Sequence, residues 1–256
     1  TGPQTVTVSI LLDTLVEGDE TFDLDLSGAV NGTIGATPGV GTIVDDDPTL
    51  DIELTASQNE NATPLIIKVN LNAASPLPIT VVATTFNGTA TAGLDYVAYS
   101  ETLTFAPGVT TEDIAIALLD DNIDEPDETF TVVLSSPTNA FIGNSTGTAT
   151  IVDDEATPTV SINSPSLNEA GGNMSFTLTL SGPSAYVLSL DLATSGVTAT
   201  DGVDFTSTTW INFTFLPGST SQTATVSLTD DNMFELDETF LFTISNLSAN
   251  LAMGTN

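Results

Sequence analysis

The sequence of 256 residues contains no cysteine, no histidine and no arginine, and Lys68 is its one basic residue. Without cysteine, no disulfide can brace the fold, and without histidine or cysteine the usual zinc ligands are missing. The usual catalytic pairs, in which a histidine or lysine activates a nucleophile, cannot be built either. Nucleic acids and anionic membrane surfaces need basic patches, which one lysine cannot supply. We therefore predict a non-enzymatic chain with no nucleic-acid partner.

No hydrophobic run approaches the roughly 20 residues of a membrane helix, so we expect no membrane insertion by this segment. In contrast, the chain carries 34 acidic residues and a formal charge of −33. Such charge is typical of disordered proteins, but 40% of the residues are hydrophobic, and the acidic ones are clustered. These features predict a folded protein whose charge lies in a few sites, with divalent cations as the natural counter-charge.

One acidic segment recurs three times, at residues 12–22, 120–130 and 230–240, which are 108 and 110 residues apart. Other segments recur at the same spacing. They are residues 41–47 with 149–155, 93–96 with 202–205, and 104–108 with 214–218. Internal repeats of this length are too long for a solenoid and suit one small domain each.

Each repeat shows hydrophobic residues at every second position, for example Leu65, Ile67, Val69 and Leu71. Similar alternation occurs over residues 130–134, 174–180 and 240–244. Period two indicates half-buried strands, and turn pairs such as Asn87-Gly88 and Pro107-Gly108 separate them. About seven strands per repeat predict an all-β fold of tandem immunoglobulin-like β-sandwich domains.

The repeat also sets the expected domain boundaries. Residues 1–47 are the C-terminal part of one domain (the first repeat), residues 48–155 a complete domain (the middle repeat), and residues 156–256 a domain lacking its last strand (the third repeat). Pro48 and Pro158 closely follow acidic triplets, which predicts short links and domains stacked end to end. The sequence has no signal peptide and begins and ends within a repeat, so we expect an internal piece of a longer chain.

Nine carboxylates of the middle repeat are candidate metal ligands because they flank predicted strands, whose loops gather at the ends of a sandwich. They are Glu60, Asp95, Asp120, Asp121, Glu125, Glu128, Asp153, Asp154 and Glu155. Carboxylates this dense repel one another unless a hard cation binds them. Calcium takes six to eight oxygen ligands, whereas magnesium demands tighter octahedral geometry. The sequence therefore predicts calcium.

Four ordered motifs together resemble the Calx-β domain family. They are Asp-Asp-x-x-x-Glu-x-x-Glu-Thr-Phe at residues 120–130, Gly-x-Asp-Tyr at 93–96, Phe-x-Pro-Gly at 105–108, and Ile-Val-Asp-Asp-Glu at 151–155. The resemblance implies calcium-binding immunoglobulin-like sandwiches, known from sodium/calcium exchangers, integrin β4 and large bacterial surface proteins. It places calcium at one end of each sandwich.

The resemblance also implies ligands in all three repeats. In the middle repeat it adds the backbone carbonyl of Ile123 to the nine carboxylates. In the third repeat it implies Glu169, Asp204, Asp230, Asp231, Glu235 and Glu238, with the carbonyl of Met233. In the first repeat it implies Asp13, Glu17, Glu20, Asp45, Asp46 and Asp47. Leu12 stands where the other repeats have Asp120 and Asp230, and the third repeat ends before its last acidic triplet, so the middle site is the complete one.

Two other interpretations of the acidic segments remain open. An acidic run can be a solvated face, and we expect Asp124 and Asp127 to be solvated in this way. Paired carboxylates also occur in glycosidases, but Trp210 is the only tryptophan, and the same carboxylates recur in every repeat.

The sequence thus predicts a calcium-binding structural or adhesive repeat segment of a large extracellular, bacterial-type surface protein. We expect calcium to cross-link the acidic loops and to stiffen the junctions between neighbouring repeats, with a surface glycan or protein as the target. The alternative is an intracellular calcium-sensing regulatory domain of a membrane transporter. A cadherin-like array shares this physics, but its usual motifs are absent.

Overall fold

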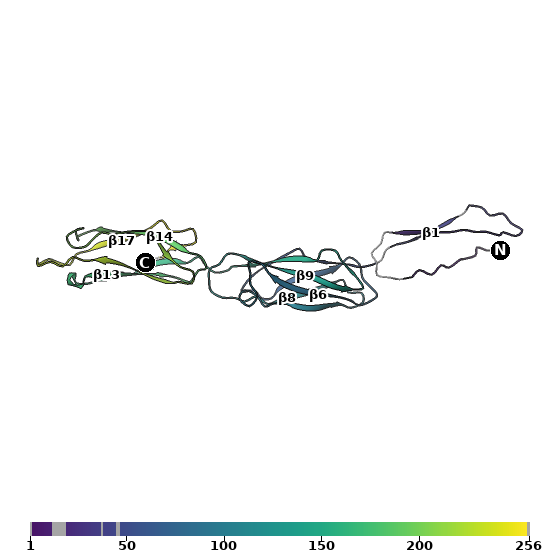
Figure 1. Ribbon diagram of the computed structural model, residues 1–256, viewed down its shortest axis with the longest axis horizontal. Helices are drawn as coiled ribbons and strands as arrows, with labels where there is room; N and C mark the ends of the chain where they lie inside the picture. The colour runs from purple at the N-terminus through teal and green to yellow at the C-terminus, as the bar shows by residue number, and fades with distance from the viewer. Residues whose placement is uncertain (1, 12–18, 37, 45–46, 255–256) are drawn as a thin grey trace. The chain divides into compact units, whose positions relative to one another are not determined.

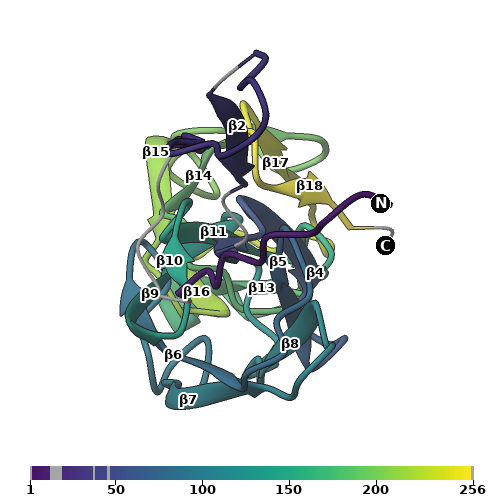
Figure 2. The same ribbon diagram turned by 90° about the vertical axis from the view of Figure 1, so that its right-hand side faces the viewer.

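The computed structural model describes residues 2–11, 19–36, 38–44 and 47–254. Strands dominate these residues (Figures 1 and 2), and their one helix is a short 3-10 turn, η1 (Glu169–Gly171). No helix in this part of the chain has the length and hydrophobicity needed to span a membrane. The chain divides into two compact units. The first comprises Thr1–Gln58, Ala62–Leu119 and Glu128–Ile151, and the second comprises Asn59–Asn61, Asp120–Asp127 and Val152–Asn256.

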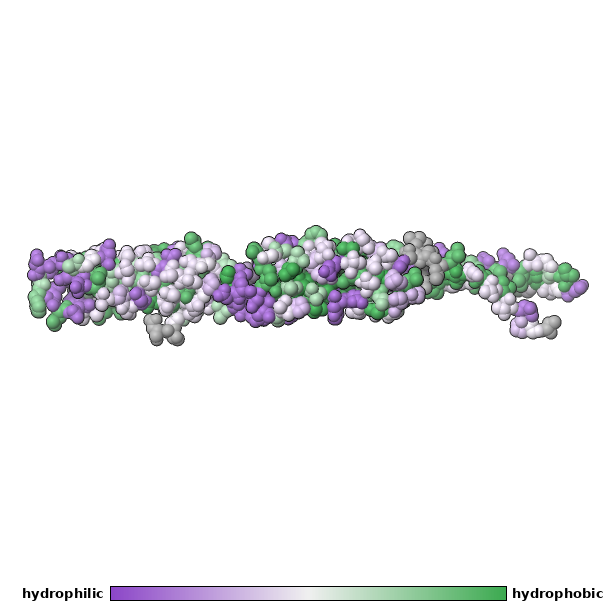
Figure 3. All heavy atoms as spheres, turned by 90° about the horizontal axis from the view of Figure 1, so that it is seen from below, coloured by the Kyte–Doolittle hydropathy of each residue, from purple (hydrophilic) through white to green (hydrophobic). Residues whose placement is uncertain are grey.

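The first compact unit begins with an antiparallel hairpin of β1 (Glu20–Leu24) and β2 (Gly39–Ile43), in which Phe22 faces Gly41. Several large hydrophobic residues of this segment are exposed, among them Leu26 and Val40. Hydrophobic surface is visible on this segment at the right of Figure 3.

The rest of this unit is a sandwich of two sheets. One sheet has the order β10-β3-β5-β8 and the other β4-β11-β9-β6-β7. Their strands are β3 (Thr49–Ile52), β4 (Thr55–Asn59), β5 (Leu65–Leu71), β6 (Ile79–Asn87), β7 (Ser100–Phe105), β8 (Thr111–Ile116), β9 (Glu128–Thr138), β10 (Phe141–Ile142) and β11 (Thr146–Val152).

The core of this sandwich follows the predicted alternation. In β5, every second side chain from Leu65 to Leu71 is buried, while those between them are exposed. Tyr96 and Phe130 are fully buried and stack with their ring centroids 4.1 Å apart. The period-two pattern of the sequence therefore places one face of each strand in the core.

The second compact unit contains two further sheets, ordered β16-β13-β12-β18 and β15-β14-β17. Their strands are β12 (Thr159–Ile162), β13 (Asn173–Leu180), β14 (Leu188–Gly196), β15 (Thr209–Phe215), β16 (Ser221–Ser227), β17 (Phe240–Ser245) and β18 (Ala252–Met253). Phe205 and Phe215 are fully buried between them.

The two sandwiches differ at one strand. β9 lies between β11 and β6, whereas β17 pairs with β14 alone among the described residues. In agreement, Phe130 of β9 is fully buried, while its equivalent Phe240 in β17 is half-buried. The prediction of an all-β fold of tandem sandwiches is confirmed.

Candidate metal centre

Four carboxylates of the middle repeat meet in one cluster within the second compact unit. Glu60, Asp120, Asp154 and Glu155 each offer one oxygen, and these atoms all lie within 4.8 Å of one another. Glu60 follows β4, Asp120 lies shortly after β8, and the last two residues follow β11. The cluster thus joins three segments that are far apart in the sequence.

Glu60 is the buried member of this cluster, with 7% of its surface exposed. Its backbone N–H donates to the carbonyl of Val152 at 3.1 Å, which fixes the residue beside the end of β11. Its Oε1 atom and Oε2 of Glu155 are buried without a hydrogen-bond partner. Burial raises the pKa of Glu60 to about 8, helped by a hydrogen bond and repulsion from Glu155 and by the charges of Asp121 and Asp153.

Hydrogen bonds hold the acidic segments around this cluster. The side-chain amide of Asn61 donates to Asp154. The backbone N–H of Glu125 donates to Oδ1 of Asp153 at 3.0 Å, and the N–H of Asp153 donates to Oδ1 of Asp127 at 3.3 Å. Burial nevertheless raises the pKa of Asp153. The segments after β8 and β11 are therefore tied together by polar contacts.

One short turn of the acidic loop is built in the same way in two repeats. The N–H of Ile123 donates to Oδ1 of Asp121 at 2.7 Å, and the N–H of Met233 donates to Oδ1 of Asp231 at 2.6 Å. A side-chain oxygen that accepts from the backbone two residues later defines this turn. Neither aspartate belongs to a carboxylate cluster of the described residues.

A second turn also recurs. Oδ2 of Asp95 accepts from the N–H of Thr91 at 2.6 Å, and Oδ2 of Asp204 accepts from the N–H of Thr200 at 2.6 Å. The two aspartates then differ, because Asp204 joins a cluster and Asp95 does not.

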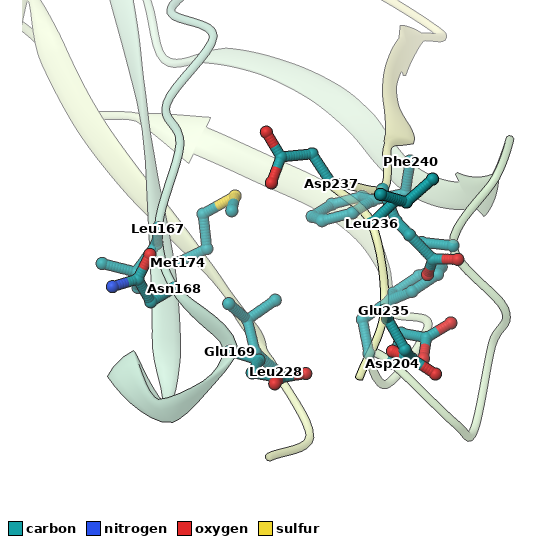
Figure 4. Close-up of a pocket in the computed structure, with 13 residues that line it drawn as sticks. Leu167, Asn168, Glu169, Met174, Asp204, Leu228, Glu235, Leu236, Asp237 and Phe240 are labelled. Carbon is teal, nitrogen blue, oxygen red and sulfur yellow. The ribbon is translucent and has the colours of Figure 1, made fainter. Parts of the chain in front are cut away.

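The cluster of the third repeat has three members, Asp204, Glu235 and Glu238, whose oxygens also lie within 4.8 Å of one another. They line a cavity of about 300 Å³. Figure 4 shows Asp204 and Glu235 on one side of this cavity and Leu167 and Met174 on the other. This site is more open than that of the middle repeat, because its two glutamates are exposed.

Mutual repulsion is visible in the pKa values of this second cluster. A hydrogen bond to Asp204 raises the pKa of Glu238, with smaller contributions from desolvation and from neighbouring charges. Desolvation, followed by the charges of Asp204, Asp231 and Glu169, raises the pKa of Glu235. Carboxylates that hold protons in this way are poised to exchange them for a cation.

The remaining ligands expected from the sequence lie outside both clusters. Glu169 begins η1 and is exposed, although it lines the cavity of the third repeat. Glu128 begins β9 and Glu20 begins β1. The others in the described part of the chain are Asp47, Asp95, Asp121, Ile123, Glu125, Asp153, Asp230, Asp231 and Met233. Asp13, Glu17, Asp45 and Asp46 fall outside the described residues.

The expectation that Asp124 is solvated is wrong, whereas Asp127 is exposed. Asp124 is 7% exposed, and its Oδ2 accepts from the hydroxyl of Ser184 at 2.7 Å. Its N–H donates to the carbonyl of Pro183 at 3.2 Å, and its own carbonyl accepts from the N–H of Ala185 at 2.9 Å. The sequence contains no signal for this contact, because the partner lies 60 residues later.

The chemistry of the donors fits a hard cation. Every side-chain donor in both clusters is a carboxylate oxygen, and two buried oxygens of the middle cluster have no other partner. Buried polar atoms are rarely left unpaired, and buried charges are normally compensated. Calcium accepts such oxygen ligands in flexible geometry.

The chain matches the Calx-beta domain family over three segments, residues 1–49, 44–155 and 153–255. It is 31% identical over 252 residues to Extracellular matrix protein 3 of Lytechinus variegatus, which covers 91% of this chain and 8% of that protein. It is 28% identical over 270 residues to human FRAS1-related extracellular matrix protein 2, with coverage of 96% and 8%. The chain thus spans less than a tenth of these relatives' length.

A third relative is Sodium/calcium exchanger 1 of Bos taurus, 31% identical over 182 residues, which covers 62% of this chain and 19% of that protein. Among solved structures, the apo-form Calx CBD1 domain is 27% identical with a TM-score of 0.41, covering 43% of this chain and all of that one. The CBD12 fragment of CALX1.2 is 21% identical with a TM-score of 0.42, covering 78% of this chain and 80% of that one.

Proposed function

Because the chain belongs to the Calx-beta domain family, we propose that it is a calcium-binding structural repeat segment of a large extracellular protein. Calcium binds the carboxylate clusters of the repeats and cross-links loops that otherwise repel one another. The family and the matrix-protein relatives identify the segment as non-enzymatic.

One observation supports calcium above all others, namely the buried carboxyl of Glu60. A solvated acidic face would leave its carboxylates in water, whereas Glu60 is 7% exposed and has an unpartnered oxygen 4.8 Å or less from oxygens of three other carboxylates. Burying such a group is costly unless a cation compensates it. We therefore assign Glu60, Asp120, Asp154 and Glu155 as the ligands of the principal site.

The cluster of Asp204, Glu235 and Glu238 is our proposal for a second, weaker site. It has fewer carboxylates than the principal site and two of them are exposed. Affinity for calcium rises with the number of charged ligands and with the rigidity of the site. We propose that calcium at these sites also stiffens the junctions between repeats, because Asp154 and Glu155 lead directly into the third repeat.

The extracellular location is supported by the matrix proteins of sea urchin and human, which match at least nine tenths of this chain. A cell-surface role in adhesion, toward a glycan or protein target, is the finer form of this proposal. The exchanger relative favours a second candidate, a calcium-sensing regulatory segment of a membrane transporter. The sequence that flanks the segment distinguishes them, since further repeats support the first and a bundle of membrane helices the second.

The experiment is a calorimetric titration of the whole chain with calcium, using Glu60→Gln and Glu169→Gln as a matched pair. The two residues occupy equivalent positions, but Glu60 is buried in a cluster and Glu169 is exposed. We expect Glu60→Gln to remove the tightest binding step and Glu169→Gln to leave that step unchanged. Equal isotherms for Glu60→Gln and the unmodified chain would contradict the assignment.

A further inference from the structure

The acidic loop of the third repeat, residues 230–238, ends in an apolar tip. Phe234 is 97% exposed, Leu236 83% and Met233 68%. Three large apolar side chains this close together, in a loop otherwise rich in carboxylates, form an exposed hydrophobic surface that nothing in the described residues covers. Surfaces of this kind mark interaction sites.

The equivalent loop of the middle repeat shows what such a tip contacts. Asp124 occupies the position of Phe234, and it forms an isolated β-bridge with Ser184. Two backbone hydrogen bonds and one side-chain hydrogen bond hold this pair together. Tyr186 lies beside it, since the carboxylates of Asp124 and Asp127 contribute to its raised pKa after desolvation. The tip of one acidic loop therefore rests on the loop of residues 183–186.

The receiving loop is itself a repeated structure. In the third repeat, the carbonyl of Ser184 accepts from Gly218 at 2.9 Å, and its hydroxyl accepts from the N–H of Tyr186 at 3.2 Å. In the middle repeat, Ser75 makes the same two contacts, with Gly108 at 2.9 Å and with the N–H of Leu77 at 3.1 Å. Both serines are buried. The loop of residues 74–77, which we call the receiving loop, thus has the same local geometry as the occupied one.

The two free partners match in chemistry. Where Asp124 meets Ser184 and Tyr186, the free tip carries Phe234, and the receiving loop carries Leu77, which is 51% exposed. Residues 71–79 contain no acidic residue, so the acidic loop meets no like charge there. We propose that the tip formed by Met233, Phe234 and Leu236 docks on the receiving loop, residues 74–77, of a second copy of this chain.

This docking is heterologous, because the tip of one copy meets a different surface on the next. Contacts of this kind produce open, head-to-tail assemblies unless the geometry closes a ring. The docking side chains are apolar and are not metal ligands, so the proposal stands or falls independently of the calcium sites.

The test measures self-association of the whole chain by sedimentation equilibrium, up to concentrations on the order of 100 µM, where weak interfaces assemble. Phe234→Asp removes the tip and restores the residue of the middle repeat, and Leu77→Asp removes the receiving surface. We expect the unmodified chain to increase in mass with concentration and each variant to stay monomeric. An equimolar mixture of the two variants restores a dimer but no larger species, because each retains one intact partner.

Ile211→Asp is the control, since Ile211 is 74% exposed on β15, away from both loops. It should associate like the unmodified chain, and all three variants should keep the melting temperature. A monomeric unmodified chain, a monomeric Ile211→Asp variant, or two variants that fail to complement would each overturn the proposal. So would flotation with anionic vesicles that requires Phe234 in a chain that does not self-associate, which would assign the tip to a membrane. Each measurement is made with calcium and with chelator, so that a failed calcium site and a failed docking surface are told apart.

Discussion

At the scale of the residue, Glu60 should make stability depend on pH when calcium is absent. Its pKa is about 8 in the folded chain and near its ordinary value of 4.5 when unfolded. The folded state therefore binds more protons between these values, and stability must fall as pH rises. In chelator, we expect the urea midpoint of the second compact unit to decrease steadily from pH 5 to pH 8.

Glu60→Gln should flatten this dependence, because the amide stays neutral throughout the range. Asp153, whose pKa is also raised, has the same sign and leaves a smaller residual slope. Asp191 and Asp201 act outside the window, since hydrogen bonds lower their pKa from 3.8 and their stabilisation is lost only in stronger acid. A midpoint that rises between pH 5 and pH 8 in the unmodified chain would show that Glu60 is not buried as the structure places it.

The sequence identified Glu60 as a candidate ligand but not as the buried one. Its burial depends on the chain end of β11, whose Val152 accepts its N–H, and on neighbours that no local pattern encodes. Glu169 occupies the same position in the third repeat and is exposed within η1. Two residues with the same motif context thus differ in environment, which only the three-dimensional arrangement reveals.

At the scale of the element, the loop that carries Asp124 should depend on one hydroxyl. Ser184→Ala removes the donor at 2.7 Å and leaves a buried carboxylate oxygen without it, so we expect a loss of about 1–3 kcal/mol in the free energy of unfolding. Ser75→Ala is the matched control, because Ser75 makes the same backbone contacts but has no carboxylate partner. Its loss should be about 0.5–1.5 kcal/mol. Equal losses, measured by urea unfolding, would contradict a specific role for the Asp124 contact.

The strands themselves were predictable because alternation of apolar residues encodes which face is buried. β5 and β9 follow the pattern residue by residue. The meeting of Asp120 with Asp154 was predictable in kind, since loops gather at the ends of sandwiches. The contact of Asp124 with Ser184 was not, because a polar loop residue normally faces water and its partner is specified by tertiary structure alone.

At the scale of the whole molecule, a charge of −33 opposes compaction whether or not metal sites exist. Two contributions are then mixed, the general repulsion between exposed carboxylates and the local repulsion inside the clusters. Dissolved salt screens the first, because the Debye length falls from about 30 Å at 0.01 M to about 10 Å at 0.1 M. The second acts over 4.8 Å or less and involves the buried Glu60, where salt penetrates poorly.

This separation predicts different responses to sodium and to calcium. In chelator, sodium chloride should raise the melting temperature gradually over the range 0.01–0.1 M, about one Debye length of change. Calcium at a hundred times its dissociation constant should add about 2.7 kcal/mol per site, at far lower ionic strength, because it binds only the folded state. Magnesium, which needs tighter geometry, should give a smaller shift. If calcium and magnesium raise the melting temperature equally, and no more than sodium at the same ionic strength, then screening of a solvated acidic surface explains the stability and the clusters are not binding sites.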